Sequence, residues 1–494
     1  MTNPFSAVRD AVLDLDLDLD LDLDLDLDAD GNEAQGARKK FPHQPIGQAV
    51  DMGHADDGTP LIDPRLFDSS EFRRNPYPYY RIMRDHHPVF HDRLHNCYYV
   101  TRYTDVEAAY FDEVGFNTIP KGSSSGVLGN TQLELSGLEH RRRRNIYGRH
   151  LVGAALTKRL PALRSLADDL IARWWHPDNP KNVEVDGGTV VVELGRAFAN
   201  EFPIGVVAQV LGIPVEARAQ FNWWYDAMMS GLGGSDTHHE GLVARQDLEE
   251  YVGSLVEERR TSPTHLYDED GNEICKDIIS ELCHAEIDGD VMSTEEITSF
   301  VALVVGGGGE TTRGAIMNLW YLLLQHPDQY QAVLDDPDLW HAAFHEMLRH
   351  STSIGGQPRH NTFEIELHDV VIPAGSLVHM VDVSANHDDR VFAEPERFDI
   401  FRNDLYSDKI LRSGYDKDGR RSHMAFGVGP HLCPGAWISE QETVVGAQVL
   451  SETFRNIRLE IDRMPTGLDG STLAPVGLGS IRELWLRMDR PAAQ

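Results

Sequence analysis

Apolar residues recur with a helical period over most of this chain. The longest such patterns fill residues 138–172 and 190–260, where apolar positions lie three and four residues apart and therefore predict amphipathic helices. Ser293 is followed three residues later by Glu296, a capping box that predicts the start of an apolar helix running to about residue 324. Shorter helical patterns end near His87 and cover 328–335 and 340–350.

Strand-like patterns are short. Residues 89–100 are expected to form a hairpin, and further short strands are expected within 362–384. Strands and helices do not alternate along the chain, so a parallel α/β sheet is not predicted. The sequence predicts a mainly α fold with a smaller β portion.

The first forty residues differ in character from the rest. Leucine and aspartate alternate through residues 13–28, which is the period of a strand, yet the aspartates would lie on one face and repel one another. The end of the repeat also opens like an EF-hand loop, but Ala37 stands where such a loop requires a bidentate glutamate. We expect a disordered acidic tail over 1–40 and a single globular domain over 41–494.

The charge and the cysteine content exclude several classes of protein. Asp and Glu outnumber Lys and Arg by 79 to 45, which leaves a net charge of −34. Nucleic acid and anionic membrane surfaces would repel such a chain, so neither is an expected partner. Four cysteines in 494 residues do not form a disulfide framework, and no apolar run is long enough to span a bilayer. We expect a cytoplasmic protein in which any special cysteine is a ligand or a nucleophile.

The segment 426–435, with the sequence Phe-Gly-Val-Gly-Pro-His-Leu-Cys-Pro-Gly, carries the strongest chemical signal. Its glycines and first proline permit a tight backbone approach before Cys433, and Gly435 opens a helix with apolar spacing. A thiolate at that position faces the positive end of a helix, which lowers its pKa and suits it to bind a metal. A buried structural cysteine is the alternative.

This segment resembles the haem-binding loop of the cytochromes P-450, and further motifs of that superfamily follow in the expected order from about residue 65 to the C-terminus. The resemblance implies a cytochrome P-450 fold with haem b, whose iron is bound by the Cys433 thiolate. It also assigns Phe426, Gly427 and Gly435 to the haem pocket. A cysteine thiolate on haem iron favours O–O cleavage.

Four consecutive glycines, Gly306 to Gly309, lie within the apolar helix expected after the capping box. Each costs about 1 kcal/mol relative to alanine in a helix, so we expect the backbone to approach a flat ligand there and the helix to open locally. A loop between two helices is the alternative. The segment resembles the oxygen-binding groove of the superfamily, which implies that Glu310 and Thr311 deliver protons. The Thr311 hydroxyl can bond the Gly307 carbonyl four residues back.

Two further groups of charged residues match the superfamily. Glu346 and Arg349 resemble its Glu-x-x-Arg helix, and the resemblance implies that Arg397 completes a structural network around Glu346 beneath the haem. Four residues match the clamps for the two haem carboxylates: His140, Arg144, Arg359 and His431. Buried carboxylates need paired donors, and a spacing of four places His140 and Arg144 on one helix face.

The substrate pocket is assigned by the resemblance to small or apolar positions. These are Val305, Gly306, Gly309, Ile354 and Val476. Their character favours a small to medium, apolar organic substrate.

Two other patterns are set aside. Gly122 to Gly126 matches the nucleophile elbow of serine hydrolases, but it lacks the flanking strand and helix that would expose the serine. His341 and His345 could hold zinc from one helix face, but no third ligand is in view, so we expect them at the surface.

The sequence contains no flavin, nicotinamide or four-cysteine iron–sulfur motif, so electrons are expected from a separate ferredoxin and its reductase, as the resemblance implies. It indicates an NAD(P)H-dependent monooxygenase that inserts one atom of O2 into its substrate. Alternatives are a superfamily member that performs phenol coupling, desaturation or peroxygenation, and a non-catalytic haem sensor or carrier. Glu310 and Thr311 favour oxygen activation over these alternatives. The row Arg141 to Arg143 is expected to include the docking site of an acidic ferredoxin.

Overall fold

The fold was analysed in a computed structural model of the whole chain. The structure describes residues 49–69, 71–72, 75–118, 132–148, 150–175, 183–186, 188–233, 237–267, 273–287, 289–404, 423–460, 462–463 and 481–490. The acidic tail, the Gly122–Gly126 segment and Val476 lie outside the described residues, so the predictions made for them remain predictions.

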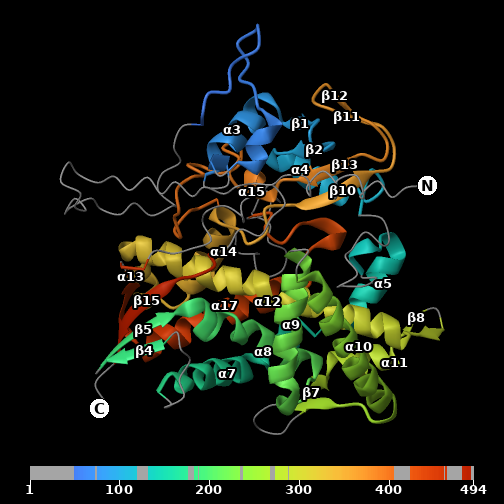
Figure 1. Cartoon of the computed structure of the whole chain (residues 1–494), viewed down its shortest axis with the longest axis vertical. Helices are drawn as coiled ribbons and strands as arrows, with labels where there is room; N and C mark the ends of the chain where they lie inside the picture. Colours follow the sequence, from blue (N-terminus) through green and yellow to red (C-terminus); the bar gives the residue numbers. More distant parts are fainter. Residues whose placement is uncertain are drawn as a thin grey trace. The chain divides into compact units, whose positions relative to one another are not determined.

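Helices form most of the described chain, and this confirms the predicted fold class (Figure 1). The α-helices are α3 (Tyr77–His86), α4 (Tyr103–Phe111), α5 (Gly137–Gly148), α6 (Gly153–Thr157), α7 (Leu160–Ala172), α8 (Glu201–Leu211), α9 (Arg218–Gly233), α10 (His238–Thr261), α11 (Ile278–His284), α12 (Thr294–Gln325), α13 (Pro327–Asp335), α14 (Leu339–His350), α15 (Asp382–Ala385) and α17 (Ala436–Thr453). Short 3-10 helices lie at Pro64–Asp68, Gln132–Glu134, Arg173–Trp175, Val215–Ala217 and Gly429–His431, and a π-helix lies at Gly195–Ala199.

The strands form two main sheets and three small hairpins. The larger sheet has the order β1 (Val89–Asp92), β2 (Cys97–Val100), β13 (Leu377–Met380), β10 (Gln357–Asn361) and β3 (Phe116–Asn117). All its pairs are antiparallel except β2 with β13. The second sheet has the order β14 (Arg455–Leu459), β15 (Trp485–Asp489), β5 (Thr189–Glu193) and β4 (Val183–Asp186). The hairpins are β6 (His265–Tyr267) with β7 (Glu273–Lys276), β8 (Glu286–Ile287) with β9 (Asp290–Val291), and β11 (Ile365–Leu367) with β12 (Val370–Ile372).

One predicted boundary is wrong. The helical pattern expected from residue 190 begins with strand β5, because Val190, Val191 and Val192 pair with β15 on one side and β4 on the other. A run of β-branched residues suits a pleated surface better than a helix. The helical pattern of 138–172 is likewise divided into α5, α6 and α7.

Helix α12 is the element around which the site is built. The Ser293 side chain accepts from the Glu296 backbone N–H, and the Glu296 side chain accepts from that of Ser293, so the predicted capping box is confirmed. The helix contacts α8 and α10 and also packs against α14 and α17, the helices that carry Glu346 and follow Cys433 (Figure 1). No helix in the described part of the chain combines the length and apolar character that crossing a membrane requires.

Candidate active site

The Cys433 loop is shaped by two glycines in the left-handed region. Gly427 has φ +63° and Gly429 has φ +71°, conformations that a side chain at either position would strain. The turn is closed by the Cys433 N–H, which donates to the Phe426 carbonyl at 2.9 Å. Gly435 then caps the start of α17, which places the cysteine where that helix begins.

The protonation of Cys433 differs from the expectation. Burial raises the pKa of the Cys433 thiol, and the Gly435 N–H and Arg144 lower it by less. The predicted net lowering is therefore wrong for the chain by itself, because desolvation outweighs one hydrogen bond and one guanidinium.

The glycine segment of α12 remains helical throughout. The expected local opening of the helix is therefore wrong, and so is the alternative of a loop between two helices. Gly307 is exposed, and a Cβ added there would meet nothing within 4 Å. The Thr311 hydroxyl donates to the Gly307 carbonyl at 2.7 Å, which confirms the predicted hydrogen bond. Helix α12 therefore presents an open backbone face at Gly307, with the Thr311 hydroxyl turned onto it.

Two of the four glycines serve helix packing instead. A Cβ at Gly308 would lie 2.6 Å from Val207 of α8, and one at Gly309 would lie 2.5 Å from the Tyr225 ring of α9. Gly309 was expected to line the substrate pocket, and the structure instead buries it beneath Tyr225. A glycine is needed at position 309 because helix α9 approaches the backbone of α12 there. The sequence pattern could not distinguish this helix contact from a contact with a ligand.

The remaining positions assigned to the pocket differ in exposure. Val305 is fully buried, whereas Gly306 and Ile354 are partly exposed. In the described chain the open part of this region therefore lies at Gly306, Gly307 and Ile354.

Glu310 has a partner that sequence reasoning missed. Its Oε1 accepts from Arg313 Nη1 at 2.9 Å. Arg313 is largely buried and also donates to the Asn200 side chain at 2.6 Å and to the Arg482 carbonyl at 2.5 Å. The Arg313 guanidinium, fixed by these three hydrogen bonds, holds Glu310 in place. Neither the charge of Arg313 nor its i,i+3 spacing from Glu310 distinguished it in the sequence from a surface residue.

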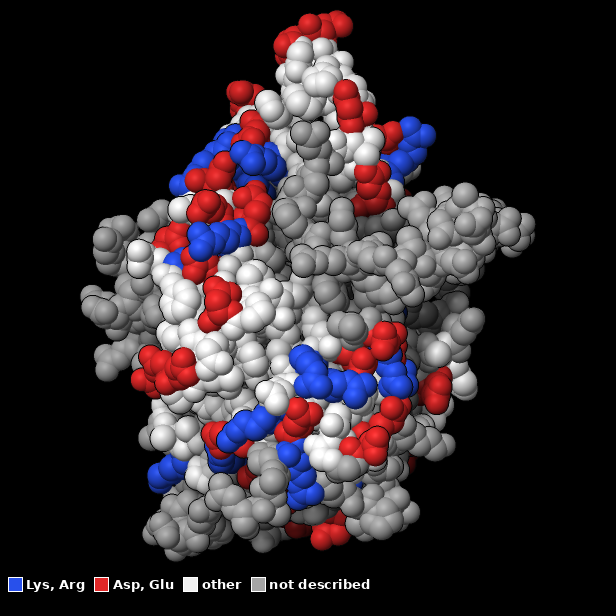
Figure 2. Space-filling view, turned by 90° about the vertical axis from the view of Figure 1, so that its left-hand side faces the viewer, with Lys and Arg blue, Asp and Glu red and all other residues white. Residues whose placement is uncertain are grey.

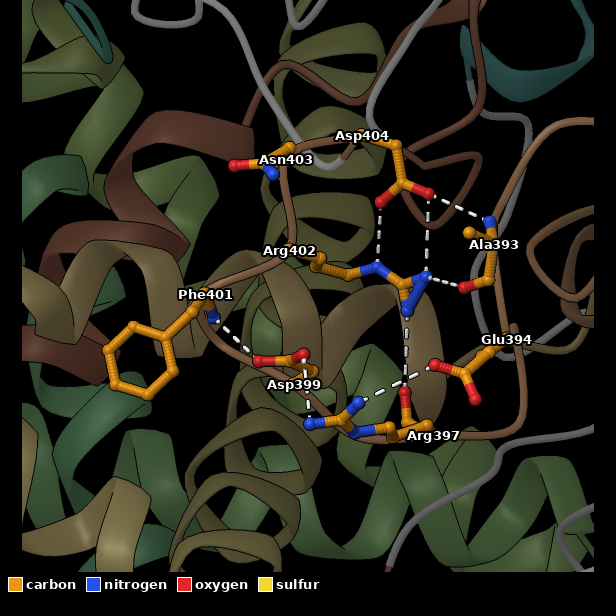
Figure 3. A pocket seen from close by; sticks show the side chains of 8 residues that line it. All are labelled: Ala393, Glu394, Arg397, Asp399, Phe401, Arg402, Asn403 and Asp404. Atoms are coloured by element: carbon orange, nitrogen blue, oxygen red, sulfur yellow. Dashed lines mark hydrogen bonds and ion pairs between the residues drawn. The ribbon is translucent and has the colours of Figure 1, made fainter.

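The buried ion pair of α14 has a different third member from the one expected. Glu346 and Arg349 are both 0% exposed and are joined by two hydrogen bonds of 2.7 and 2.8 Å. The second guanidinium beside Glu346 belongs to Arg402, 3.7 Å away and 6% exposed. The Arg397 side chain is 61% exposed and pairs with Glu394 and Asp399, as Figure 3 shows. The predicted role of the Arg397 side chain is therefore wrong.

Arg397 still takes part in the network through its backbone. Its carbonyl accepts from Arg349 Nη2 at 3.0 Å and from Arg402 Nη1 at 3.4 Å. The pocket of about 340 Å³ in Figure 3, formed by residues 393–404, lies on the outer side of this network and is lined mainly by charged side chains.

Replacing Arg349 with methionine is expected to lower the free energy of unfolding by about 3–5 kcal/mol, because the buried Glu346 carboxylate loses both hydrogen bonds from Arg349 and keeps only the more distant Arg402 guanidinium. The matched control, Arg397→Met, removes an exposed guanidinium and is expected to change it by no more than about 1 kcal/mol. Urea unfolding of both variants checks the assignment. Equal destabilisation by the two would restore Arg397 to the buried network.

Three of the four residues expected at the haem carboxylates gather beside the Cys433 loop. The His140 and His431 rings stack with centroids 4.0 Å apart, and Arg144 donates to the Pro430 carbonyl at 3.0 Å. Arg359 lies over the Tyr110 ring at 5.1 Å. Burial, followed by the neighbouring His140, Arg359 and Arg144, lowers the pKa of His431 to about 3, so all four predicted residues act on one region.

This region fits an anionic group. Burial lowers the pKa of His140 too, and Arg144 adds to the effect, so both imidazoles are neutral hydrogen-bond donors beside two guanidiniums. His140 Nδ1 is buried and has no hydrogen-bond partner among the described residues. The donors therefore fit the carboxylates of a haem whose iron is bound at Cys433.

His341 and His345 were both expected at the surface, and for His345 this expectation is wrong. His341 Nδ1 bonds Glu440 Oε1 at 2.7 Å, and His345 Nδ1 lies 3.0 Å from His423 Nε2. The His345 side chain is only 12% exposed. This chain of imidazoles joins α14 to α17 and to the start of the Cys433 loop, which only the packing of those three segments could reveal.

Comparisons with known proteins identify the family of the chain. The family model described as Cytochrome P450 matches residues 219–465, half of the chain. Pulcherriminic acid synthase of Bacillus subtilis (strain 168) is 26% identical over 400 residues, covering 80% of this chain and 92% of that protein. Nocardicin C N-oxygenase of Nocardia uniformis subsp. tsuyamanensis is 28% identical over 397 residues, covering 78% and 89%.

A solved structure is similar over most of the chain. Cytochrome P450 CYP109Q5 from Chondromyces apiculatus is 25% identical, with a TM-score of 0.68, and the match covers 86% of this chain and 98% of that one. The chain belongs to the cytochrome P450 superfamily, the haem-thiolate monooxygenases, and is of the bacterial type.

Proposed function

We propose that this protein inserts one oxygen atom from O2 into a small to medium, apolar organic molecule. The observation that carries the proposal is the Thr311 hydroxyl bonded to the Gly307 carbonyl, beside an exposed glycine and next to an anchored carboxylate in α12. A haem sensor or carrier has no need of a positioned acid and alcohol in that groove. The pair likewise favours O2-driven oxygenation over coupling or desaturation.

Haem b is held, in this proposal, by the Cys433 sulfur at its iron and by His140, Arg144, Arg359 and His431 at its carboxylates. Phe426, Gly427 and Gly435 shape the loop around the sulfur. When bound, the haem supplies the binding and activation of dioxygen. We assign residues 41–494 to this one haem domain.

Protons are supplied by the chain itself. Thr311 Oγ1 carries a proton that now points to the Gly307 carbonyl, and it can turn toward a reactant in the open space beside Gly307. Arg313 occupies Glu310 Oε1, so Oε2 is the oxygen that would pass a proton to Thr311. Burial, and then the charge of Glu310, raises the pKa of Tyr225, so Tyr225 stays protonated and does not compete as an acid.

The substrate is proposed to lie against Gly306, Gly307 and Ile354, with Val476 completing the pocket and the buried Val305 packed behind them. The names of the two relatives described above differ in the product or the reaction, and one of them is an N-oxygenase. They do not indicate a particular substrate for this chain. A screen of organic compounds by substrate-binding difference spectra would define that class.

The test of the proposed function is reconstitution with a ferredoxin, a ferredoxin reductase and NADPH under isotopically labelled dioxygen. We expect one labelled oxygen atom in the product of a compound that the spectral screen selects. Product that forms only with added peroxide, or without label, would favour the peroxygenase or coupling alternatives.

Charge reversal at Arg142 is expected to slow reduction by ferredoxin on the order of fivefold at low salt, with the difference shrinking as salt increases. Within the arginine row the Arg143 side chain is only 19% exposed, whereas Arg142 is exposed. Arg142 is therefore placed to steer an acidic partner, and its reversal leaves the contact of Arg141 with Glu113 in place.

Stopped-flow reduction of Arg142→Glu at several salt concentrations measures this effect. The control is Arg81→Glu on α3, an exposed arginine on another part of the molecule (Figure 1). On the face that Figure 2 shows, Lys and Arg lie among Asp and Glu. Equal rates for both variants and the wild type would remove α5 as the docking site.

A further inference from the structure

Glu113 is a carboxylate among the residues assigned to the haem carboxylates, and no sequence motif pointed to it. It lies in the turn between α4 and β3, and its side chain is 16% exposed. His431 Nε2 donates to its Oε1 at 3.1 Å, Arg141 Nη1 donates to its Oε2 at 3.2 Å, and the Gly137 N–H approaches Oε1 at 3.4 Å. The carboxylate thus already occupies one donor of the proposed haem site, His431 Nε2.

The arrangement also has the geometry of a cation site, but its charge argues against one. One ligand atom each from Glu113, His140 and His431 lies within 4.8 Å of the other two, as two imidazoles and a carboxylate around zinc would. However, Arg141 contacts the same carboxylate, and Arg144 and Arg359 both act on His431. Three guanidiniums would repel a divalent cation and attract an anion, so an anionic ligand is favoured.

Two carboxylates then compete for one donor. His431 Nε2 carries a single N–H, and in the haem-free chain Glu113 accepts it. A haem carboxylate that is to use that donor must displace Glu113 or lie beside it, and two ionised carboxylates at one site repel each other. Glu113 would still have a partner on the outer side, because Arg141, whose side chain is 53% exposed, already donates to its Oε2.

We propose that Glu113 is an internal competitor of the haem carboxylates: it accepts from both His431 and Arg141 in the haem-free chain, gives up His431 and keeps Arg141 when haem binds, and thereby lowers the retention of haem. The inference rests on the proposed function, in which His140 and His431 hold those carboxylates. It makes Glu113 a determinant of haem exchange with no part in the oxidation itself.

The test follows haem transfer from the full-length holoprotein to excess apomyoglobin. Glu113→Gln keeps the shape of the side chain and removes its charge, and we expect haem loss roughly tenfold slower than in the wild type. The matched control is Glu139→Gln, which removes a 52% exposed carboxylate paired with Arg143 from the same helix region and is expected to leave the rate unchanged. A merely structural role for Glu113 would instead speed haem loss.

A second variant keeps the inference testable if Glu113→Gln folds poorly. Arg141→Gln removes the outer partner of Glu113 and should speed haem loss relative to the wild type; unchanged or slower loss would overturn the proposal. Where Glu113→Gln does fold, the effect of Arg141→Gln should vanish in the double variant, since the two residues act through one contact. Haem loss from Glu113→Gln as fast as from the wild type, or faster, would overturn the proposal. A wild-type protein that takes up no haem with a thiolate-type carbon monoxide spectrum would instead refute the proposed function.

Discussion

Cys433→Ser is expected to abolish the thiolate-type spectrum of the reduced carbon monoxide complex and, with it, all NADPH-driven product formation. A serine hydroxyl is a poor ligand for this metal, and it cannot supply the electron density of a thiolate. The loop should still form, because Gly427 and Gly429 hold its left-handed turns and the Cys433 N–H bonds the Phe426 carbonyl through the backbone. Haem content and the carbon monoxide spectrum are measured together.

The control is another buried cysteine. Cys283 lies in α11 and its thiol donates to the Val256 carbonyl at 3.7 Å, so Cys283→Ser removes a thiol without touching the Cys433 loop. It should keep the thiolate-type spectrum. If the Cys433→Ser protein kept that spectrum, the iron ligand would have to be a residue other than Cys433.

Thr311→Ala is expected to uncouple the enzyme while leaving NADPH consumption in place. The product formed per NADPH should fall on the order of tenfold, with hydrogen peroxide making up the difference, since positioned proton transfer contributes about 10²–10⁴-fold in enzymes. The variant removes the hydroxyl that donates to the Gly307 carbonyl. Product, peroxide and NADPH are assayed in the same reaction.

The neighbouring threonine provides a matched control. The Thr312 hydroxyl points to Ser439 of α17 at 3.2 Å, so Thr312→Val deletes an adjacent hydroxyl from the same helix and should keep the coupling. Thr311→Ser should restore it, because the hydroxyl returns. Unchanged coupling in Thr311→Ala would require another proton route.

Glu310 is expected to affect the rate of turnover and not the amount of product formed per NADPH. Glu310→Gln keeps an oxygen for Arg313 but cannot relay a proton as a carboxyl group does, so turnover should slow while the share of peroxide stays low. Comparing Glu310→Gln with Thr311→Ala therefore distinguishes the residue that supplies the proton from the residue that positions it.

The local parts of the site could be predicted from the sequence. The capping box at Ser293 and Glu296, the Thr311–Gly307 bond and the glycines before Cys433 all involve residues within ten positions of each other. Their geometry follows from backbone conformation and short hydrogen bonds, so the order of residues was sufficient. The pairing of Glu346 with Arg349 belongs to the same class.

Only the tertiary structure decided which distant residues meet. Arg402, rather than Arg397, reaches Glu346 because the segment after Pro395 turns back over α14, and Glu113 meets His431 because α4 packs against the Gly429–His431 turn. Gly309 is a glycine because Tyr225 of α9 lies against it. A charged residue or a glycine in the sequence indicates that a contact is formed there. Which residue forms that contact depends on long-range packing, because two residues of the same type, such as Arg397 and Arg402, can lie close together along the chain.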